Sequence, residues 1–265
     1  MSDGGQPAGD DRHRYDTDER RELSEGSYVA ALEVVPLLLE AVRPTSAIDV
    51  GCGTGGWLKA LQDAGVERVQ GIDGGDVADD VLLIDPSCFQ RADLRRPIER
   101  TGTFDLVVSI EVGEHLPPER AAGFVHDLCS FGDVVLFSAA IPGASRVAVG
   151  GPQHAGHINE QWPSYWAERF RAEGYVPVDL IRPQLWDRRD VAIAVRQHLL
   201  VYVREGTEGI GRALLSSPAA GPAYLDVVHP QWVRAIMLEI ERPGVRQTLK
   251  APAAIGRSIR NRLGR

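Results

Sequence analysis

The residues best suited to chemistry stand together in the run Glu111-Val112-Gly113-Glu114-His115, at the end of the apolar stretch 104–111. If a helical turn begins there, Glu111 and Glu114 share a face at a spacing of three, with His115 adjacent. Two carboxylates and an imidazole can hold a divalent cation, and hard oxygen ligands favour magnesium or manganese. An imidazole can also act without a metal as a general base. The block therefore predicts a metal site or a metal-free base, and the sequence leaves both open.

A further histidine, His157, lies downstream in the loop expected after the next strand. Ligands of open parallel sheets bind outside the carboxyl ends of the strands, so this loop is expected to face the same site. The candidate metal ligands are Glu111, Glu114, His115 and His157, and the candidate catalytic residues are His115, His157 and Glu111. Histidines without such neighbours are interpreted as surface or packing residues: His13, His126, His198 and His229.

A glycine-rich loop, residues 48–57 (IDVGCGTGGW), joins the first expected strand to a helix. Glycines let the backbone turn tightly and approach a ligand without a Cβ in the way. Gly51, Gly53 and Gly56 also satisfy the G-x-G-x-x-G pattern, so a dinucleotide-binding fold competes with other nucleotide folds here.

Three acids near this loop favour a different ligand. Asp49 stands two residues before Gly51, where a carboxylate suits an ammonium group and would repel a pyrophosphate. Asp73 ends the second expected strand, where acids accept hydrogen bonds from ribose hydroxyls. Asp93, followed by Leu94, comes after the third strand, where an acid can accept from the amino group of adenine. Ammonium, ribose and adenine in this order describe S-adenosylmethionine (SAM).

With these motifs the chain resembles class I SAM-dependent methyltransferases over about residues 28–203. IDVGCGTGGWL is similar to the first motif of that family, GID to its second-strand acid, RADL to its adenine segment and FDLVVSIEVGEHL to its fourth-strand motif. The run 156–166 (GHINEQWPSYW) resembles a bacterial subgroup of uncharacterised methyltransferases, often of the kind that decorate sugars or natural products. The matching motifs contain the residues taken as cofactor contacts: Asp49, Gly51, Cys52, Gly53, Gly55, Trp57, Asp73, Asp93, Leu94 and Glu111.

The E-x-x-E-H block with a downstream histidine is similar to the metal site of small-RNA 2′-O-methyltransferases, and a related block occurs in ubiquinone-pathway O-methyltransferases. This resemblance implies the ligands alone. The chain carries 29 Lys and Arg against 37 Asp and Glu, a net charge of −8, which argues against a nucleic-acid substrate.

The elements that must position these residues alternate between apolar strands and helices. Strands are expected within 47–50, 66–73, 88–94, 104–111, 134–140, 175–181 and 198–203. Buried strands separated by helices predict an α/β fold, with a doubly wound, mainly parallel seven-stranded sheet. Little helix separates the last two strands, so an antiparallel strand is expected at one edge.

Three regions follow from composition: a flexible N-terminal arm (1–25), a SAM-binding domain (26–204) and a C-terminal helical extension (205–265) with a basic tail. No apolar run is long enough to span a bilayer and no signal peptide precedes the domain, so a cytoplasmic protein without a membrane partner is expected. The oligomeric state stays open, a homodimer included.

Together these observations predict transfer of the SAM methyl group to a hydroxyl of a small molecule, a sugar or natural product, with or without Mg²⁺ or Mn²⁺. Two alternatives remain. One is a nucleotide-dependent oxidoreductase that uses the same glycine loop, and the other is a non-catalytic SAM-binding scaffold.

Overall fold

The computed structural model describes residues 17–74, 77–146, 156–221 and 224–241 of the 265. Seven strands form one sheet in the order β3-β2-β1-β4-β5-β7-β6. All pairs from β3 to β5 are parallel, whereas β7 runs antiparallel to both β5 and β6. The strands are β1 (Ser46–Val50), β2 (Arg68–Asp73), β3 (Phe89–Arg91), β4 (Leu106–Ile110), β5 (Val134–Ser138), β6 (Tyr175–Val178) and β7 (Leu200–Arg204).

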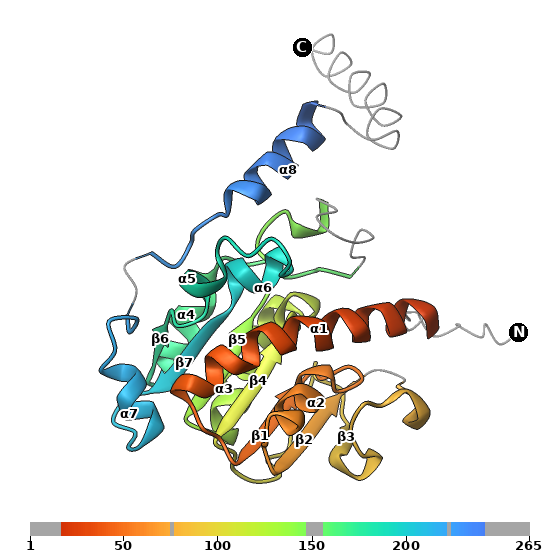
Figure 1. Ribbon diagram of the computed structural model, residues 1–265, viewed down its shortest axis with the longest axis vertical. Helices are drawn as coiled ribbons and strands as arrows, with labels where there is room; N and C mark the ends of the chain where they lie inside the picture. Colours follow the sequence, from red (N-terminus) through yellow and green to blue (C-terminus); the bar gives the residue numbers. More distant parts are fainter. Residues whose placement is uncertain (1–16, 75–76, 147–155, 222–223, 242–265) are drawn as a thin grey trace, which may run out of the picture.

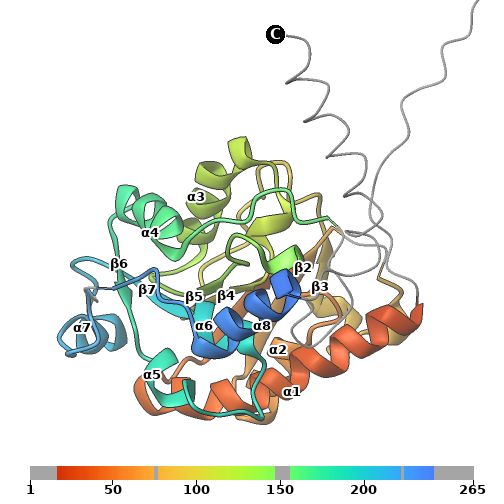
Figure 2. The ribbon, with the colours of Figure 1, turned by 90° about the horizontal axis from the view of Figure 1, so that it is seen from above.

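The helices cover both faces of this sheet (Figure 1 and Figure 2). One hydrophobic cluster joins α1, α2 and the short helices α5–α7 to one face, and a second joins α3 and α4 to the other. The helices are α1 (Thr17–Ala41), α2 (Gly56–Asp63), α3 (Ala121–Phe131), α4 (Pro163–Ala172), α5 (Arg182–Leu185), α6 (Ile193–His198), α7 (Ile210–Leu215) and α8 (Pro230–Glu241).

Strands β4, β5 and β7 are mainly apolar runs because helices bury both faces of the sheet there. In β4, Leu106 and Val108 join the cluster under α1 and α2, while Val107 points into the cluster under α3 and α4. All three side chains are fully buried. Successive side chains of the strand thus point into two different cores rather than into a core and solvent, as is typical of doubly wound sheets.

The expected α/β fold is confirmed, with seven strands, a mainly parallel sheet and an antiparallel pair at one edge. Two details differ from the expectation, one at the start of α1 and one between β6 and β7. Helix α1 begins at Thr17, before the expected end of the arm at residue 25, and it continues through Pro36 to Ala41. The expected edge is more helical than its sequence suggested, because α5 and α6 lie between β6 and β7. The basic tail at 242–265 lies outside the described residues.

The topology brings the carboxyl ends of β1, β2, β4 and β5 to one edge of the sheet, where Asp49, Asp73, Glu111 and Ser138 lie at or next to the strand ends. Helix α8 lies beyond this edge, next to α6 (Figure 1). Its Trp232 is buried against Ala140 and Ile141, which follow β5. Within the described ranges, no helix is both long and apolar enough to cross a membrane.

Candidate active site

The glycine loop after β1 has the backbone that its sequence predicts. Gly51, Gly53 and Gly55 have φ angles of +88°, +54° and +89°, in the left-handed region that favours glycine. A Cβ on Gly51 would lie 2.3 Å from a methyl group of Val112, whereas a Cβ on Gly53 would meet nothing within 4 Å. Gly51 is therefore required by packing as well as by conformation, and Gly53 borders open space.

Asp73 at the end of β2 holds this loop in place. One oxygen of its carboxylate accepts a hydrogen bond of 2.8 Å from the backbone N–H of Gly53. The N–H of Gly51 donates to the carbonyl of Ile72 at 2.7 Å, so the loop is fastened to β2 at two points. The predicted neighbourhood of Asp73 and the glycine loop is thereby present.

Asp49 is a buried acid on β1, 2% exposed. Burial raises its pKa well above the ordinary value, and the negative charge of Asp73 raises it further. A neutral carboxyl at this edge would ionise if a cation were placed beside it. Asp49 therefore has the electrostatics of an ammonium-binding residue.

Two predicted cofactor contacts of the loop are buried. Cys52 is 6% exposed, and burial followed by the charges of Asp49 and Asp73 raises the pKa of its thiol well above the ordinary value. Trp57 on α2 lies in the hydrophobic cluster under α1. The side chains of Trp57 and Cys52 therefore both pack in the core.

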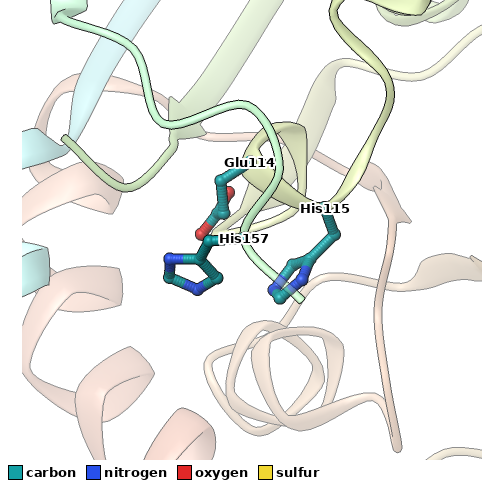
Figure 3. Close-up of side chains that lie close together, drawn as sticks. All are labelled: Glu114, His115 and His157. Atoms are coloured by element: carbon teal, nitrogen blue, oxygen red, sulfur yellow. The ribbon is translucent and has the colours of Figure 1, made fainter. Parts of the chain in front are cut away.

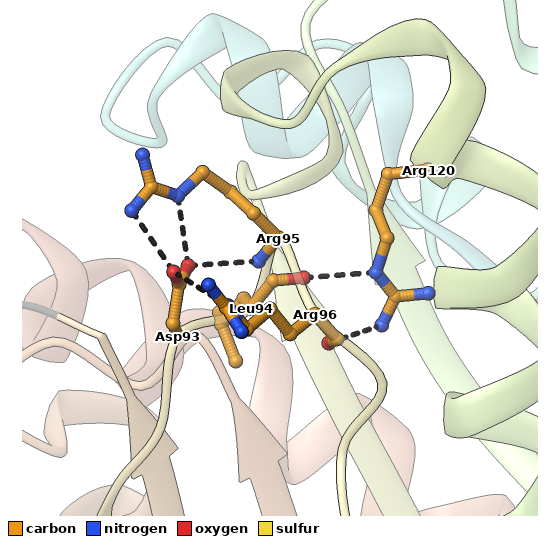
Figure 4. Close-up of polar contacts among 5 residues, drawn as sticks. All are labelled: Asp93, Leu94, Arg95, Arg96 and Arg120. Atoms are coloured by element: carbon orange, nitrogen blue, oxygen red, sulfur yellow. Dashed lines mark hydrogen bonds and ion pairs between the residues drawn. The ribbon is translucent and has the colours of Figure 1, made fainter.

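The predicted adenine segment, Asp93 and Leu94, is built into a network of arginines (Figure 4). Both carboxylate oxygens of Asp93 accept from the guanidinium of Arg95, at 2.8 and 2.9 Å. The buried Arg120 donates to the carbonyls of Leu94, at 3.1 Å, and of Arg96, at 2.8 Å. The arginine is itself paired with buried Asp127 on α3. The segment is thus held by α3, a connection that the sequence did not indicate.

Three of the four predicted metal ligands converge (Figure 3). Glu114, His115 and His157 each offer one ligand atom, and these atoms lie within 4.8 Å of one another. The two imidazole rings meet edge to face, with their centroids 4.8 Å apart. We call these three residues the Glu-His-His cluster. The block at 113–115 is a single 3-10 helical turn, which begins after Glu111.

Glu114 is fully buried, and neither carboxyl oxygen makes a hydrogen bond of ordinary geometry with any described residue. Burial, with the charge of Glu111, raises its pKa well above the ordinary value. Its backbone carbonyl accepts from the N–H groups of Ile158 and Asn159, at 2.8 and 3.0 Å. These two bonds bring the segment that carries His157 against the turn.

Glu160 fixes the orientation of His157. The Nδ1 atom of His157 lies 2.9 Å from Oε1 of Glu160, which also accepts from the backbone N–H of Ser145, while Oε2 accepts from the backbone N–H of Gly143. Despite partial burial, these donors hold the pKa of Glu160 below its ordinary value. An ionised Glu160 requires a proton on Nδ1 of His157, so Nε2 is the nitrogen that can act as a base or ligand.

Glu111, the fourth predicted ligand, lies outside the cluster. It has a φ of +55°, the only positive φ among the non-glycine residues of the described chain. Ser138 donates to its carboxylate at 2.8 Å, and the Nδ1 atom of His198 lies 3.5 Å from the same oxygen. Burial alone would raise the pKa of Glu111, but His198 and Ser138 outweigh it, so the pKa is lowered.

Sequence reasoning missed three residues behind this site. His198 and His229, interpreted as surface or packing residues, are both buried, and they make polar contacts with the fully buried Gln197. No motif marks these residues, because they meet only through the fold. The one available indication was a polar pair, Gln197 and His198, directly before the apolar strand β7.

The comparisons with known proteins agree on the family. A family model described as a methyltransferase domain matches residues 19–190. The chain is 34% identical over 115 residues to a probable chloroplastic tocopherol O-methyltransferase from Oryza sativa subsp. japonica, a match that covers 40% of this chain and 29% of that protein. The chain therefore spans less than a third of this curated relative.

Solved structures of methyltransferases share the fold. The sugar N-methyltransferase KedS8 from Streptoalloteichus sp ATCC 53650 matches with a TM-score of 0.55 and 18% identity, over 77% of this chain and 98% of that one. DesVI of Streptomyces venezuelae matches with a TM-score of 0.51 and 15% identity, over 72% of this chain and 100% of that one. The methyltransferase domain of bacterial-CtHen1-C matches with a TM-score of 0.50 and 23% identity, over 67% and 98%.

The family match decides between the two nucleotide folds that the glycine loop left open, in favour of the methyltransferase. The sheet order and the acids at the strand ends agree with that result. The chain belongs to the methyltransferase domain family, in the SAM-dependent class with the Rossmann-like fold.

Proposed function

We propose that the protein transfers the methyl group of SAM to a hydroxyl of a small molecule, a sugar or natural product. The observation that carries this proposal is the Glu-His-His cluster at the carboxyl edge of the sheet. Hydroxyls are poor nucleophiles until they lose their proton, and this cluster offers imidazole nitrogen at the same edge as the cofactor loop. An amine acceptor would have less need of such a group.

The cofactor is proposed to bind along the glycine loop. Asp49 would meet the ammonium group and Asp73 the ribose hydroxyls, while the backbone at Gly51, Cys52, Gly53 and Gly55 lines the approach. Asp93 and Leu94 would meet adenine, with Arg95 turning away from at least one oxygen of Asp93. Arg95 is 53% exposed, so this exposed pair costs little to open.

The reaction needs the acceptor oxygen, the methyl carbon and the sulfur in line, which is mainly a matter of positioning. A new C–O bond forms as the C–S bond breaks, and S-adenosylhomocysteine leaves. The acceptor proton passes to Nε2 of His157 or to the imidazole of His115. Glu111, kept ionised beside Ser138, is proposed to face the sulfonium and acceptor.

The cluster fits a divalent cation. A buried carboxyl without a hydrogen bond, as at Glu114, is unfavourable unless a cation or proton compensates it. Two imidazoles and one carboxylate are more nitrogen-rich than the predicted set, because Glu111 lies elsewhere; this favours Mn²⁺ or a similar transition metal over Mg²⁺. A cation held by Glu114, His115 and His157 would act as a Lewis acid that lowers the pKa of the acceptor hydroxyl.

The test measures S-adenosylhomocysteine formed from SAM with a panel of hexoses, sugar nucleotides and phenols. We expect turnover to stop after treatment with a chelator and to return with Mn²⁺, while SAM affinity stays within about twofold. His157→Ala should resemble the chelated enzyme, with activity at least about tenfold lower, as is typical when a ligand is lost. Asp73→Ala should instead weaken SAM binding.

His126→Ala is the matched control, because His126 is an exposed histidine that pairs with Glu173 on the outer surface. Full turnover by the chelated enzyme would exclude a catalytic metal and leave His115 or His157 as a simple base. SAM binding without turnover on any hydroxyl or amine would favour the non-catalytic scaffold. A small-molecule acceptor, a cytoplasmic location, the absence of a nucleic-acid partner and a homodimer all stay predictions.

A further inference from the structure

A chain of buried polar groups connects the start of α8 to Glu111, and its hydrogen bonds have fixed directions. It begins at the backbone N–H of His229, which can only donate and lies 2.5 Å from Oε1 of Gln197. That bond identifies the oxygen of the Gln197 amide, because the nitrogen could not accept it. The other amide atom, Nε2, must therefore be a donor.

The donor of Gln197 determines the tautomer of His198. Nε2 of Gln197 lies 2.9 Å from Nε2 of His198, both residues being buried. Since the amide donates, Nε2 of His198 accepts and carries no proton. A neutral imidazole has one proton, which then stands on Nδ1.

The proton on Nδ1 of His198 points at the active site. Nδ1 lies 3.5 Å from Oε1 of Glu111, too long for a strong hydrogen bond, and it has no other hydrogen-bond partner among the described residues. A buried donor without a partner is costly, so it must serve a neighbouring acceptor. The facing acceptor is the Glu111 carboxylate, which Ser138 already binds from the end of β5.

The tautomer of His229 is determined in the same way. The N–H of Gln231 donates to Nδ1 of His229 at 3.0 Å, so Nε2 of His229 donates to the carbonyl of Trp186 at 2.8 Å. Trp232 packs edge to face on His198, with centroids 6.1 Å apart. The start of α8 is therefore fixed to both α5 and α6, and cannot shift without moving Gln197.

We propose that His198 is a positioning residue for Glu111, held in its Nδ1–H tautomer by Gln197 and the backbone of His229. Residues 197, 198 and 229 all lie beyond residue 190, where the family match ends. The segment after the family domain thus sets the carboxylate that the proposed function places beside the acceptor, and this inference rests on that proposal for the role of Glu111. Its own content, the tautomer and its cause, is independent of the acceptor.

The first experiment measures the tautomer directly. In ¹⁵N-histidine-labelled protein, two-bond proton–nitrogen spectra should identify the Nδ1–H form of His198, assigned by its loss in His198→Asn. Gln197→Glu keeps the shape but replaces the donor with an acceptor, so His198 should change to the Nε2–H form. Gln184→Glu on the exposed side of α5 is the matched control and should leave the spectrum unchanged. An Nε2–H form or an imidazolium in the wild type would overturn the proposal.

The second experiment measures turnover on the best acceptor of the panel above, with SAM affinity in parallel. His198→Asn keeps an N–H donor near the position of Nδ1 and should retain activity within about threefold, whereas His198→Leu should lose about 10- to 100-fold in kcat. SAM affinity should stay within about twofold in both. Equal kcat for His198→Leu and the wild type would overturn the positioning role. If no acceptor is found, the proposed function fails, and the tautomer alone decides this inference.

Discussion

Asp49 shows how one buried residue can report cofactor binding. Its pKa is raised from the ordinary 3.8 by burial and by the charge of Asp73, so the ligand-free protein holds a proton there well above that pH. An ammonium group beside it reverses the balance and favours the carboxylate. We therefore expect SAM binding to release a proton in this range, and SAM affinity to rise with pH until Asp49 is ionised without ligand.

Calorimetry in two buffers of different ionisation enthalpy measures this proton release. Asp49→Asn should abolish both the release and the pH dependence, and should weaken SAM binding by about 10- to 100-fold, the equivalent of losing a hydrogen bond to a charged group. The ligand-free fold should behave in the opposite sense. Because the folded state raises the pKa of Asp49, its contribution to stability is lost as pH rises through the raised pKa. Release that persists in Asp49→Asn would assign the proton to another group.

At the residue scale, the sequence predicted those site residues whose positions follow from their immediate neighbours in the chain. Asp49, Asp73 and the glycines could be placed because a strand end and a turn occupy consecutive positions. Nothing in the sequence could show that Glu111 would be held by His198, 87 positions away. That pairing depends on how strands β4 and β7 are ordered in the sheet, whereas Arg95 pairs with Asp93 only two positions away.

At the scale of elements, the glycine loop offers a comparison between two neighbouring positions. Gly51→Ala forces an alanine into the left-handed region and against Val112, so the free energy of unfolding should fall by about 2–5 kcal/mol, the sum of backbone strain and overpacking. Gly53→Ala meets open space and should cost only about 1–2 kcal/mol. Urea unfolding of both variants measures the difference.

Two further measurements separate the causes. Adding Val112→Ala to Gly51→Ala should restore part of the lost stability, because it removes the methyl groups that the new Cβ meets. Gly53→Ala should weaken SAM binding more than its small effect on stability suggests, because Gly53 borders the open side of the loop. Equal stability losses at the two positions would show that Val112 does not limit the loop.

The strands were more predictable than the helices between them. Strands such as β4, β5 and β7 are mainly apolar runs, and such runs are typical of a sheet with two covered faces. Helices α5 and α6 have four and six residues, too few for a 3.6-residue period to show. In α4, Trp166 and Phe170 are buried in the core, so they do not offer a face to an acceptor.

At the scale of the whole molecule, Arg182 joins the C-terminal segment to the body of the protein. Its guanidinium, 2% exposed, forms a two-pronged pair with Asp179 and donates to the carbonyl of Leu225 at 2.9 Å. Arg182→Ala should lower the free energy of unfolding by about 3 kcal/mol, because it leaves buried acceptors without a donor. Limited proteolysis should then cut near residue 225.

Arg188→Ala is the control for this prediction. Arg188 also pairs with two acids, Asp190 and Glu33, but its side chain is 46% exposed. Exposed ion pairs contribute little, so the loss should stay below about 1 kcal/mol, with no new cleavage site. Similar losses in the two variants would mean that burial of Arg182 does not determine its contribution.

The sequence did not show that residues after 204 pack against the site. The sequence placed the end of the SAM-binding domain at residue 204, yet Trp232 and His229 are buried against groups at the carboxyl edge of the sheet. The segment before α8 has weak hydrophobic periodicity, and only the folded structure shows that it packs back against the sheet edge. A fragment that ends at residue 204 would lack the backbone N–H that orients Gln197.

The left-handed backbone of Glu111 limits how this site can change, in evolution or in a directed library. At a φ of +55°, asparagine, aspartate and glycine are the readily accommodated replacements, whereas valine, isoleucine and threonine are strongly disfavoured. Variation in acceptor preference is therefore expected to arise at other residues of the site rather than at Glu111 itself. A saturation library at 111 should return a short list of folded variants, and a library at the start of α8 a longer one.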